Sequence, residues 1–266
     1  DINIVDNHVV LGTLTGAALW TALSTHKGLP ISASHALIGG LVGSAFAKIG
    51  KEGIIYSGVY KVFLFIVLSP LIGFVLGIIM LAIVYNIFKN SKPSKVNHIF
   101  KKGQLISSAL YSLGHGGNDA QKTAGIIAMI LYSNGLLKTQ TGEFTIPMWV
   151  ALMSYTVIAL GTLAGGWKVV NTLGHRITDL KPVDGFCAET SAAIILHTVT
   201  HFGIPVSTTH TITGAVIGVG TVKRFYSVRW SVSRSIIKAW IYTIPGSALI
   251  SATVYYLTNF IFSKGG

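Results

Sequence analysis

Apolar and polar stretches alternate along the chain, and their lengths predict membrane-spanning helices. The longest apolar run covers residues 59–88; as a helix it would measure about 45 Å, against roughly 30 Å for the hydrocarbon core of a bilayer. Further apolar runs cover residues 8–25, 30–47, 104–133, 148–170, 187–201, 205–222 and 236–262. We therefore expect an all-α polytopic membrane protein in which residues 59–88 are tilted and kinked at Pro70.

Several apolar runs are too short or too interrupted to cross a bilayer alone. Residues 187–201 would measure about 22 Å as a helix, and Gly203 and Pro205 separate them from the next run. We expect these two runs to form a re-entrant helical hairpin over about 187–222, matched by a hairpin over about 9–47. The glycines of residues 114–117 predict that the helix over 104–133 is also broken.

One stretch of the chain occurs twice. A shift of 175 residues superposes 25–43 on 200–218 without a gap, and eight of the nineteen positions carry the same residue. The shared types are Thr, His, Gly, Pro, Ser, His, Gly and Gly. This agreement predicts two copies of one structural unit, and broken helices at matching places in two halves indicate a transporter site.

The chemistry of each copy suits an oxyanion. Gly-x-Pro ends one helix and starts another, so the Ser and Thr residues after it lie in a first helical turn with free backbone N–H groups. These donors, the hydroxyls and the positive end of the helix dipole favour an anion. A plain capped helix is the alternative explanation for a single copy.

Composition narrows the class of protein. The chain has 266 residues, of which 51% are hydrophobic and 11% charged, and its mean hydropathy is +0.64. A soluble domain carries about 25% charged residues. The net charge of +12 lies mainly in loops, where it predicts orientation in the membrane and contact with lipid headgroups rather than nucleic-acid binding. The single cysteine, Cys187, excludes an internal disulfide.

These features define an expected organisation. We expect a first repeat over 1–88, a basic cytoplasmic linker over 89–103 and a second repeat over 104–266. The linker and the basic loop 223–234 would share the cytoplasmic face of a plasma (inner) membrane, so that the repeats have inverted topology. The first repeat lacks counterparts of 104–133 and 148–170, so we expect a longer protein with roughly 70 further residues that supply part of the site.

Several motifs resemble those of a known family, the PiT-type inorganic phosphate transporters. The resemblance lies in residues 117–122 (GNDAQK), 30–35 (PISASH), 205–210 (PVSTTH), 173–177 (LGHRI) and 185–189 (GFCAE). It extends over essentially the whole chain. Ala33 departs from the usual Thr, and Gln121-Lys122 replaces the Ala-Asn of many members, which is similar to a bacterial proton-coupled branch proposed to move metal–phosphate complexes.

The resemblance implies phosphate bound at mid-membrane between the hairpins, carried by cation (proton or sodium) symport with alternating access. The implied phosphate-binding residues are Ser32, Ser34, Ser207, Thr208, Thr209, Asn118 and Gln121. The candidates for cation or proton coupling are Asp119, His35, His210, Lys122 and Glu189, with Asn118 and Asp119 as an alternative sodium site. No cofactor is expected, and a homodimer is left open.

The residues leave some alternatives. Asp119 would pair with Lys122 one turn on, although intramembrane acids are usually functional. Lys122 is either the counter-charge of phosphate or extends outward to the interface. His115 is expected near Asp119, and the tryptophans mostly at membrane interfaces.

Three other functions compete with phosphate symport. A sulfate permease of the same family and a passive anion channel would use a similar site. An intramembrane hydrolase would need Ser207, His210 and Asp119 as a triad.

Overall fold

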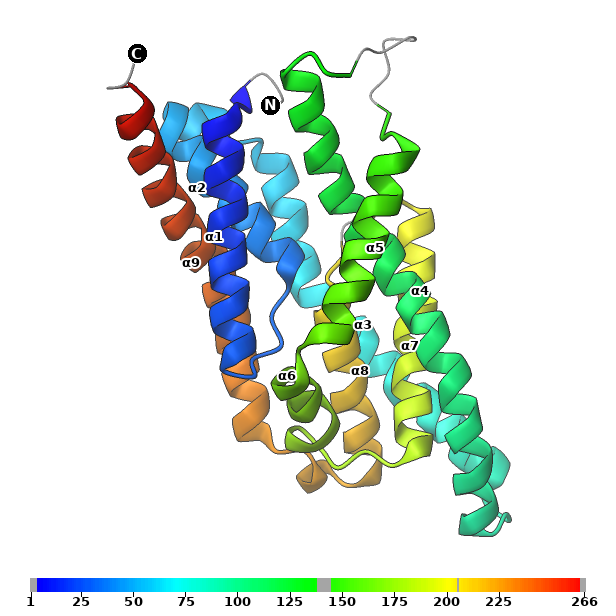
Figure 1. Cartoon of the computed structure of the whole chain (residues 1–266). Helices are drawn as coiled ribbons and strands as arrows, with labels where there is room; N and C mark the ends of the chain where they lie inside the picture. Colours follow the sequence, from blue (N-terminus) through cyan, green and yellow to red (C-terminus); the bar gives the residue numbers. More distant parts are fainter. Residues whose placement is uncertain (1–3, 138–144, 205, 264–266) are drawn as a thin grey trace.

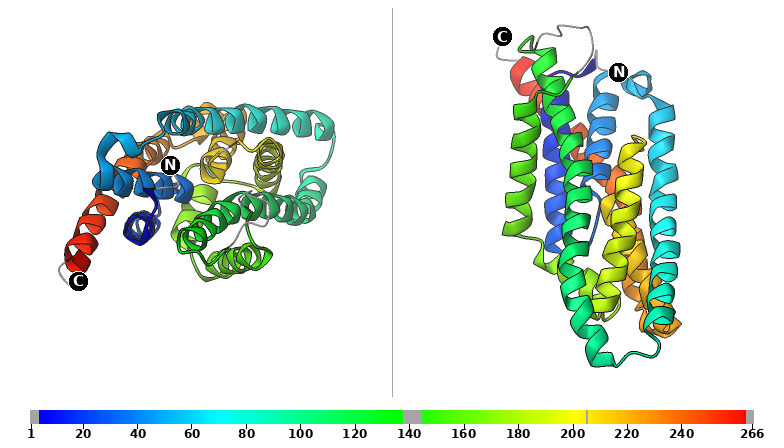
Figure 2. Two further views of the ribbon diagram at one scale, coloured as in Figure 1. Left: turned by 90° about the horizontal axis from the view of Figure 1, so that it is seen from above. Right: turned by 90° about the vertical axis from the view of Figure 1, so that its right-hand side faces the viewer.

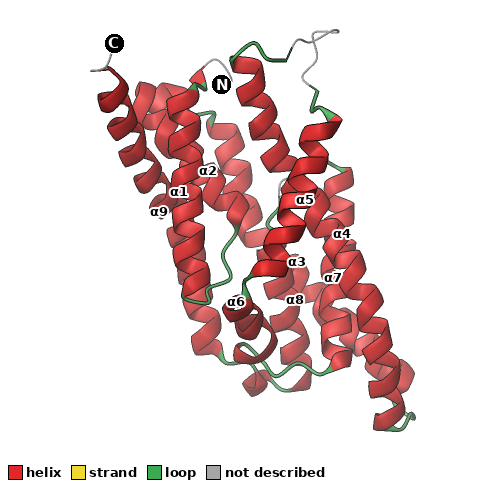
Figure 3. Ribbon diagram, viewed as in Figure 1, coloured by secondary structure: helices red, strands yellow, loops and turns green. Residues whose placement is uncertain are grey.

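The computed structural model describes residues 4–137, 145–204 and 206–263, and this part of the chain contains helices and no strand (Figure 3). The long helices are α1 (Asn7–His26), α2 (Ala33–Ile49), α3 (Tyr56–Phe88), α4 (Pro93–Ser133), α5 (Met148–Ala164), α7 (Pro182–His201), α8 (Thr208–Lys223) and α9 (Trp230–Ser263). Short helical segments are η2 (Gly50–Gly53), α6 (Trp167–Asn171), η3 (Thr172–Arg176) and η4 (Phe225–Ser227). The all-α expectation is confirmed.

Two helical hairpins run toward each other from opposite ends of the bundle. α1 runs down from the end where the N-terminus lies, the chain turns back over residues 27–32, and α2 starts near mid-height and returns to the same end (Figure 1). α7 rises from the other end, and α8 starts near mid-height and returns there (Figure 1). Seen from above, α7 and α8 lie between α3 and α4 (Figure 2). The second arms of both hairpins therefore begin in the middle of the bundle. We call the residues that lead into each second arm, together with its first turn, the hairpin tips; they are 29–35 in the first hairpin and 204 and 206–210 in the second.

Each hairpin packs against the long helix of the other half. α2 contacts α9, and α8 contacts α3. Glycines line both contacts in pairs that are 175 residues apart, Gly39 and Gly43 on α2 and Gly214 and Gly218 on α8. A methyl group on any of them would meet backbone atoms of the facing helix. Glycine is needed here because the two backbones approach closely, as is common between membrane helices.

The outer surface suits a lipid environment. α3 has 33 residues and is long and apolar enough to cross a membrane, and a bent helix pair over residues 148–176 passes the same test when its parts are joined. Large apolar side chains are exposed on α3, α5 and α9, with Val67 at 64% and Leu163 at 78%. Apolar exposure of this extent needs an apolar partner, such as lipid.

The helix expected over 104–133 is not broken at its glycines. α4 continues from Pro93 to Ser133, and none of its glycines has a positive φ. A helical glycine costs only about 1 kcal/mol relative to alanine, which packing can offset. At Gly114 an added methyl group would lie close to α7. Because α4 starts at Pro93, most of the expected linker 89–103 is also helical.

The break lies instead in the span expected over 148–170. α5 ends at Ala164, and the next helical segment is turned by 67°. Gly166 has φ 88°, a backbone conformation that strongly favours glycine. Gly165-Gly166 was the stronger signal for a break, since a left-handed residue cannot continue an α-helix.

The second hairpin begins earlier than expected. α7 starts at Pro182 rather than at 187, and its 20 residues measure about 30 Å. Its start combines proline in the first turn with Asp184, whose carboxylate accepts a hydrogen bond from the Lys181 backbone N–H. Of the two arms, only α8, with 16 residues, is short.

Candidate functional site

The two hairpin tips have the same local structure. Ser32 and Ser207 each cap the following helix with φ −92° and ψ 116°. Each hydroxyl accepts a hydrogen bond from the backbone N–H of the histidine three residues on, at 3.2 Å. Both serines are almost fully buried. The doubled sequence therefore forms the same cap twice, and the positive ends of α2 and α8 lie in the interior.

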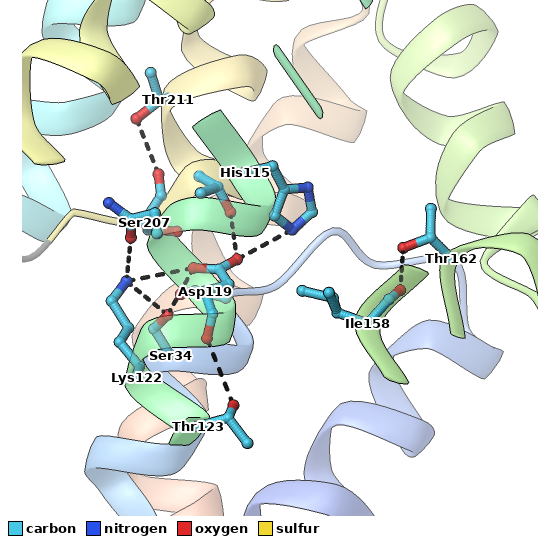
Figure 4. Close-up of polar contacts among 12 residues, drawn as sticks. Ser34, His115, Asp119, Lys122, Thr123, Ile158, Thr162, Ser207 and Thr211 are labelled. Atoms are coloured by element: carbon cyan, nitrogen blue, oxygen red, sulfur yellow. Dashed lines mark hydrogen bonds and ion pairs between the residues drawn. The ribbon is translucent and has the colours of Figure 1, made fainter. Parts of the chain in front are cut away.

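Asp119 of α4 is where the two tips meet. Its Oδ1 accepts a hydrogen bond from Ser34 of the first tip at 3.3 Å (Figure 4). Its Oδ2 accepts one from Thr208 of the second tip at 2.9 Å. His115, one turn earlier on α4, places Nε2 3.1 Å from Oδ2. A single carboxylate thus links α4 to both hairpins.

The Lys122 ammonium group lies in the same cluster. Lys122 Nζ is 3.3 Å from Asp119 Oδ1 and donates to Ser34 Oγ at 3.0 Å and to the Val206 carbonyl oxygen at 3.0 Å. It also donates to Asn118 Oδ1 at 2.5 Å. The group therefore contacts both tips and points inward rather than to the interface. The carboxylate and the ammonium compensate each other's charge, as burial requires.

Asn118 connects the cluster to α7. It is 6% exposed, and its Nδ2 donates to Thr200 Oγ1 at 3.2 Å. Because its carbonyl oxygen accepts from Lys122, both polar ends of the amide have partners. The oxygens of Asn118 and Asp119 that could hold sodium are thus in contact with the ammonium group.

His35 of α2 and His210 of α8 lie against each other. Their ring centroids are 4.7 Å apart, and the His210 ring stacks on Trp240 at 3.9 Å. Trp240 also donates from Nε1 to the Pro30 carbonyl oxygen at 2.9 Å, so this tryptophan is interior and not interfacial as expected. In the described part of the chain, neither histidine ring bonds to Asp119. The arrangement does not form the Ser207–His210–Asp119 triad of a hydrolase.

A cavity of about 390 Å³ borders the cluster between α2, α4 and α5. Its polar lining consists of Ser34, His115, Asp119, Thr123 and Ser154. The remaining wall is alanine and larger apolar side chains such as Leu37 and Met153. An apolar pocket with a few convergent polar groups is typical of a small-molecule site.

Other predicted site residues lie away from the cluster. Gln121 is exposed and lines a separate recess toward α5, beside Tyr155. Glu189 accepts hydrogen bonds from Ser107 at 2.6 Å and Gln104 at 3.4 Å, between α7 and a lower part of α4. Thr209 is half-buried in the first turn of α8. The structure therefore joins Ser34, Thr208, Asn118, Asp119 and Lys122, but not Gln121 or Glu189.

Three contributors were missed from sequence. They are Thr200, the Val206 carbonyl and Ser154. Thr200 carried a signal, since it belongs to the doubled stretch as the counterpart of Thr25. A backbone carbonyl has no residue-type signature, and Ser154 lies in an otherwise apolar run.

Comparisons with known proteins identify the family of the chain. A model described as "Phosphate transporter family" matches residues 2–251. A probable low-affinity inorganic phosphate transporter of Rhizobium meliloti is 49% identical over 98% of this chain and 77% of its own length. A protein of the same description from Bacillus subtilis is 40% identical over 96% of this chain and 75% of its own. A solved structure titled "The sodium-dependent phosphate transporter" shares the fold with a TM-score of 0.84 and 24% identity, covering 96% of this chain and 80% of the other.

Proposed function

This chain belongs to the phosphate transporter family, and we propose that it imports inorganic phosphate by proton symport at the cluster around Asp119. The family makes it a membrane protein and not an enzyme. The observation that carries the proposal is that hydroxyls from both tips, Ser34 and Thr208, converge on one interior carboxylate. A site shared by two hairpins changes its access when one hairpin moves relative to the other.

Phosphate would bind between the tips, beside Asp119. The hydroxyls of Ser34 and Thr208 and the free N–H groups of the first turns of α2 and α8 supply donors to its oxygens. Ser32, Ser207 and Thr209 contribute through these helix ends. Lys122 supplies the positive charge. Bound phosphate would replace Asp119 in part as the counter-charge of this ammonium group.

The membrane arrangement proposed is an inverted-topology repeat with two re-entrant hairpins. The opposite directions of the two hairpins and the matching glycine contacts of α2 and α8 support it. The turn from α3 to α4 and the loop 223–234 lie at the same end of the bundle (Figure 1), which supports a common cytoplasmic location.

The contacts of Lys122 favour a proton over sodium as the coupling ion. Its ammonium group contacts the Asn118 and Asp119 oxygens that a sodium ion would need, and it would repel that ion. Asp119, with His115 at 3.1 Å, remains as an acceptor that can exchange a proton. A neutral metal–phosphate complex would also fit a site that contains both the Asp119 carboxylate and the Lys122 ammonium group, and it is an alternative form of the transported substrate.

Uptake of labelled phosphate into proteoliposomes tests the proposal. An imposed proton gradient should drive accumulation without sodium, and excess sulfate should compete weakly because sulfate offers no proton near pH 7 to an acceptor such as Asp119. Accumulation that requires a sodium gradient would overturn the proton assignment. Equilibration without any gradient would indicate a passive anion channel.

A further inference from the structure

Each hairpin is closed at its base by an equivalent lysine. Lys48 lies in the last turn of α2 and Lys223 ends α8, and the two are one repeat shift of 175 residues apart. Lys48 Nζ donates to the Ile4 carbonyl oxygen at 2.8 Å, and Lys223 Nζ donates to the Asp179 carbonyl oxygen at 3.0 Å. Ile4 and Asp179 are themselves related by the same shift. Equivalent lysines therefore bind equivalent carbonyls at opposite ends of the bundle.

A carboxylate completes each contact and also caps the first arm of its hairpin. Lys48 is 2.7 Å from Asp6, which accepts from the Val9 N–H at the start of α1. Lys223 is 2.5 Å from Asp184, which caps the start of α7. In each hairpin the end of the second arm is thus fastened to the beginning of the first. We call each lysine with its carbonyl and carboxylate a base clamp.

The two carboxylates do not occupy equivalent positions. The counterpart of Asp6 is Lys181, and the counterpart of Asp184 is Val9. Both Asp6 and Lys181 are the N-cap residues of their helices. The two hairpins therefore make the same link between their arms with carboxylates at different positions. This indicates that the link itself is important to the fold, rather than one particular local sequence.

We infer that Lys48 and Lys223 are positioning residues that hold each hairpin as a rigid unit and thereby keep its tip on the phosphate site. α8 has 16 residues, so its base lies about 24 Å from Thr208, and sliding of α8 along α7 would displace that hydroxyl directly. This inference rests on the proposed phosphate site. The second clamp is the stronger one, because Asp184 is wholly buried whereas the Asp6 side chain is 40% exposed.

Lysine replacements test the clamps. Lys48→Met and Lys223→Met should each raise the Kd of purified protein for phosphate, Lys223→Met by about tenfold, and should speed hydrogen exchange at the tip of the same hairpin. Arginine at either position should restore both. Lys238→Met, at an exposed lysine of α9, is the matched control and should change neither. Unchanged affinity and unchanged tip exchange in folded Met variants would overturn the inference.

A transplanted carboxylate separates positioning from simple destabilisation. Asp184→Val should weaken binding, and Lys181→Asp added to it should restore binding by rebuilding the arrangement of the first hairpin in the second. Failure of the double variant to restore the Kd and tip exchange would contradict the inference. Absence of phosphate binding by the wild-type protein would instead refute the proposed function, and hydrogen exchange at the tips would still test the clamps.

Discussion

Lys122 Nζ on α4 lies 3.0 Å from the carbonyl oxygen of Val206 in the second hairpin tip. A lysine amine inside a membrane protein is costly unless its charge is compensated and its N–H groups are bonded. Here the same ammonium group also contacts Ser34 in the first tip. The two hairpins thus share a fixed positive charge where the proposed substrate, an anion, has to bind.

The first prediction concerns the central carboxylate. Asp119→Asn should abolish gradient-driven phosphate uptake, because the amide cannot exchange a proton and leaves Lys122 without its counter-charge. Uptake into proteoliposomes measures this, and size-exclusion chromatography shows that the variant is folded. Glu52→Gln, at an exposed acid outside the helices of the site, should transport normally. Normal accumulation by Asp119→Asn would remove the assigned role.

The second prediction concerns the choice of coupling ion. Lys122→Asn should weaken proton-driven uptake and make the remaining uptake depend on sodium, because removal of the ammonium frees the Asn118 and Asp119 oxygens. Lys122→Met frees the same oxygens but adds no oxygen ligand for sodium. Phosphate uptake by this variant should therefore depend on sodium less than uptake by Lys122→Asn. Uptake by Lys122→Asn should be measured with each gradient imposed separately. Proton-driven uptake equal to wild type would contradict a central place for this lysine.

The third prediction isolates one hydroxyl. Thr208→Val keeps the shape of the side chain and loses the 2.9 Å hydrogen bond to Asp119. In the bound state this hydroxyl would donate to a phosphate oxygen instead, and hydrogen bonds to charged groups contribute about 1.5–3 kcal/mol, so phosphate affinity should fall by roughly 10- to 150-fold. Calorimetric titration measures the Kd for phosphate. Thr208→Ser keeps the hydroxyl and should retain most of the affinity. Thr253→Val is the control, since Thr253 is exposed and its hydroxyl donates to the Leu249 carbonyl of its own helix, α9. Equal affinities for Thr208→Val and wild type would place phosphate elsewhere.

The fourth prediction concerns the close helix contacts. Gly43→Ala and Gly218→Ala should each destabilise the protein by about 1–3 kcal/mol, because the methyl group meets the backbone of α9 or α3. Thermal unfolding in detergent measures the loss. Gly58→Ala, where no atom lies within 4 Å of the added carbon, should leave the melting temperature the same or higher. A similar response at all three glycines would argue against the packing described.

The doubled stretch carried most of the information that sequence could provide. It predicted matching helix starts at the two prolines, and Ser32 and Ser207 have the same backbone angles, although both serines cap their helices rather than lie in the first turn. It also placed Ser34 and Thr208 in the first turns of interior helices, where both contact Asp119. These features are local, because a cap is decided by a few neighbouring residues.

Features that depend on packing were harder to predict. The glycines of α4 suggested a break, yet packing against α7 keeps that helix continuous, whereas the left-handed Gly166 breaks the next span. The tryptophans were expected mostly at membrane interfaces, whereas Trp240 stacks on His210 in the interior. The break at Gly166 had a local signal, whereas the continuity of α4 and the place of Trp240 are not encoded in residue type alone, because each depends on a helix distant in sequence.

Locating a bound substrate analogue tests the account most directly. Arsenate has the shape and charge of phosphate, and its arsenic atom gives an anomalous X-ray signal, so crystals grown with arsenate report its position without ambiguity. The account predicts a peak between the two hairpin tips, within hydrogen-bonding reach of Ser34, Thr208 and Lys122. A peak that contacts only one hairpin, or that lies away from Asp119, would contradict it.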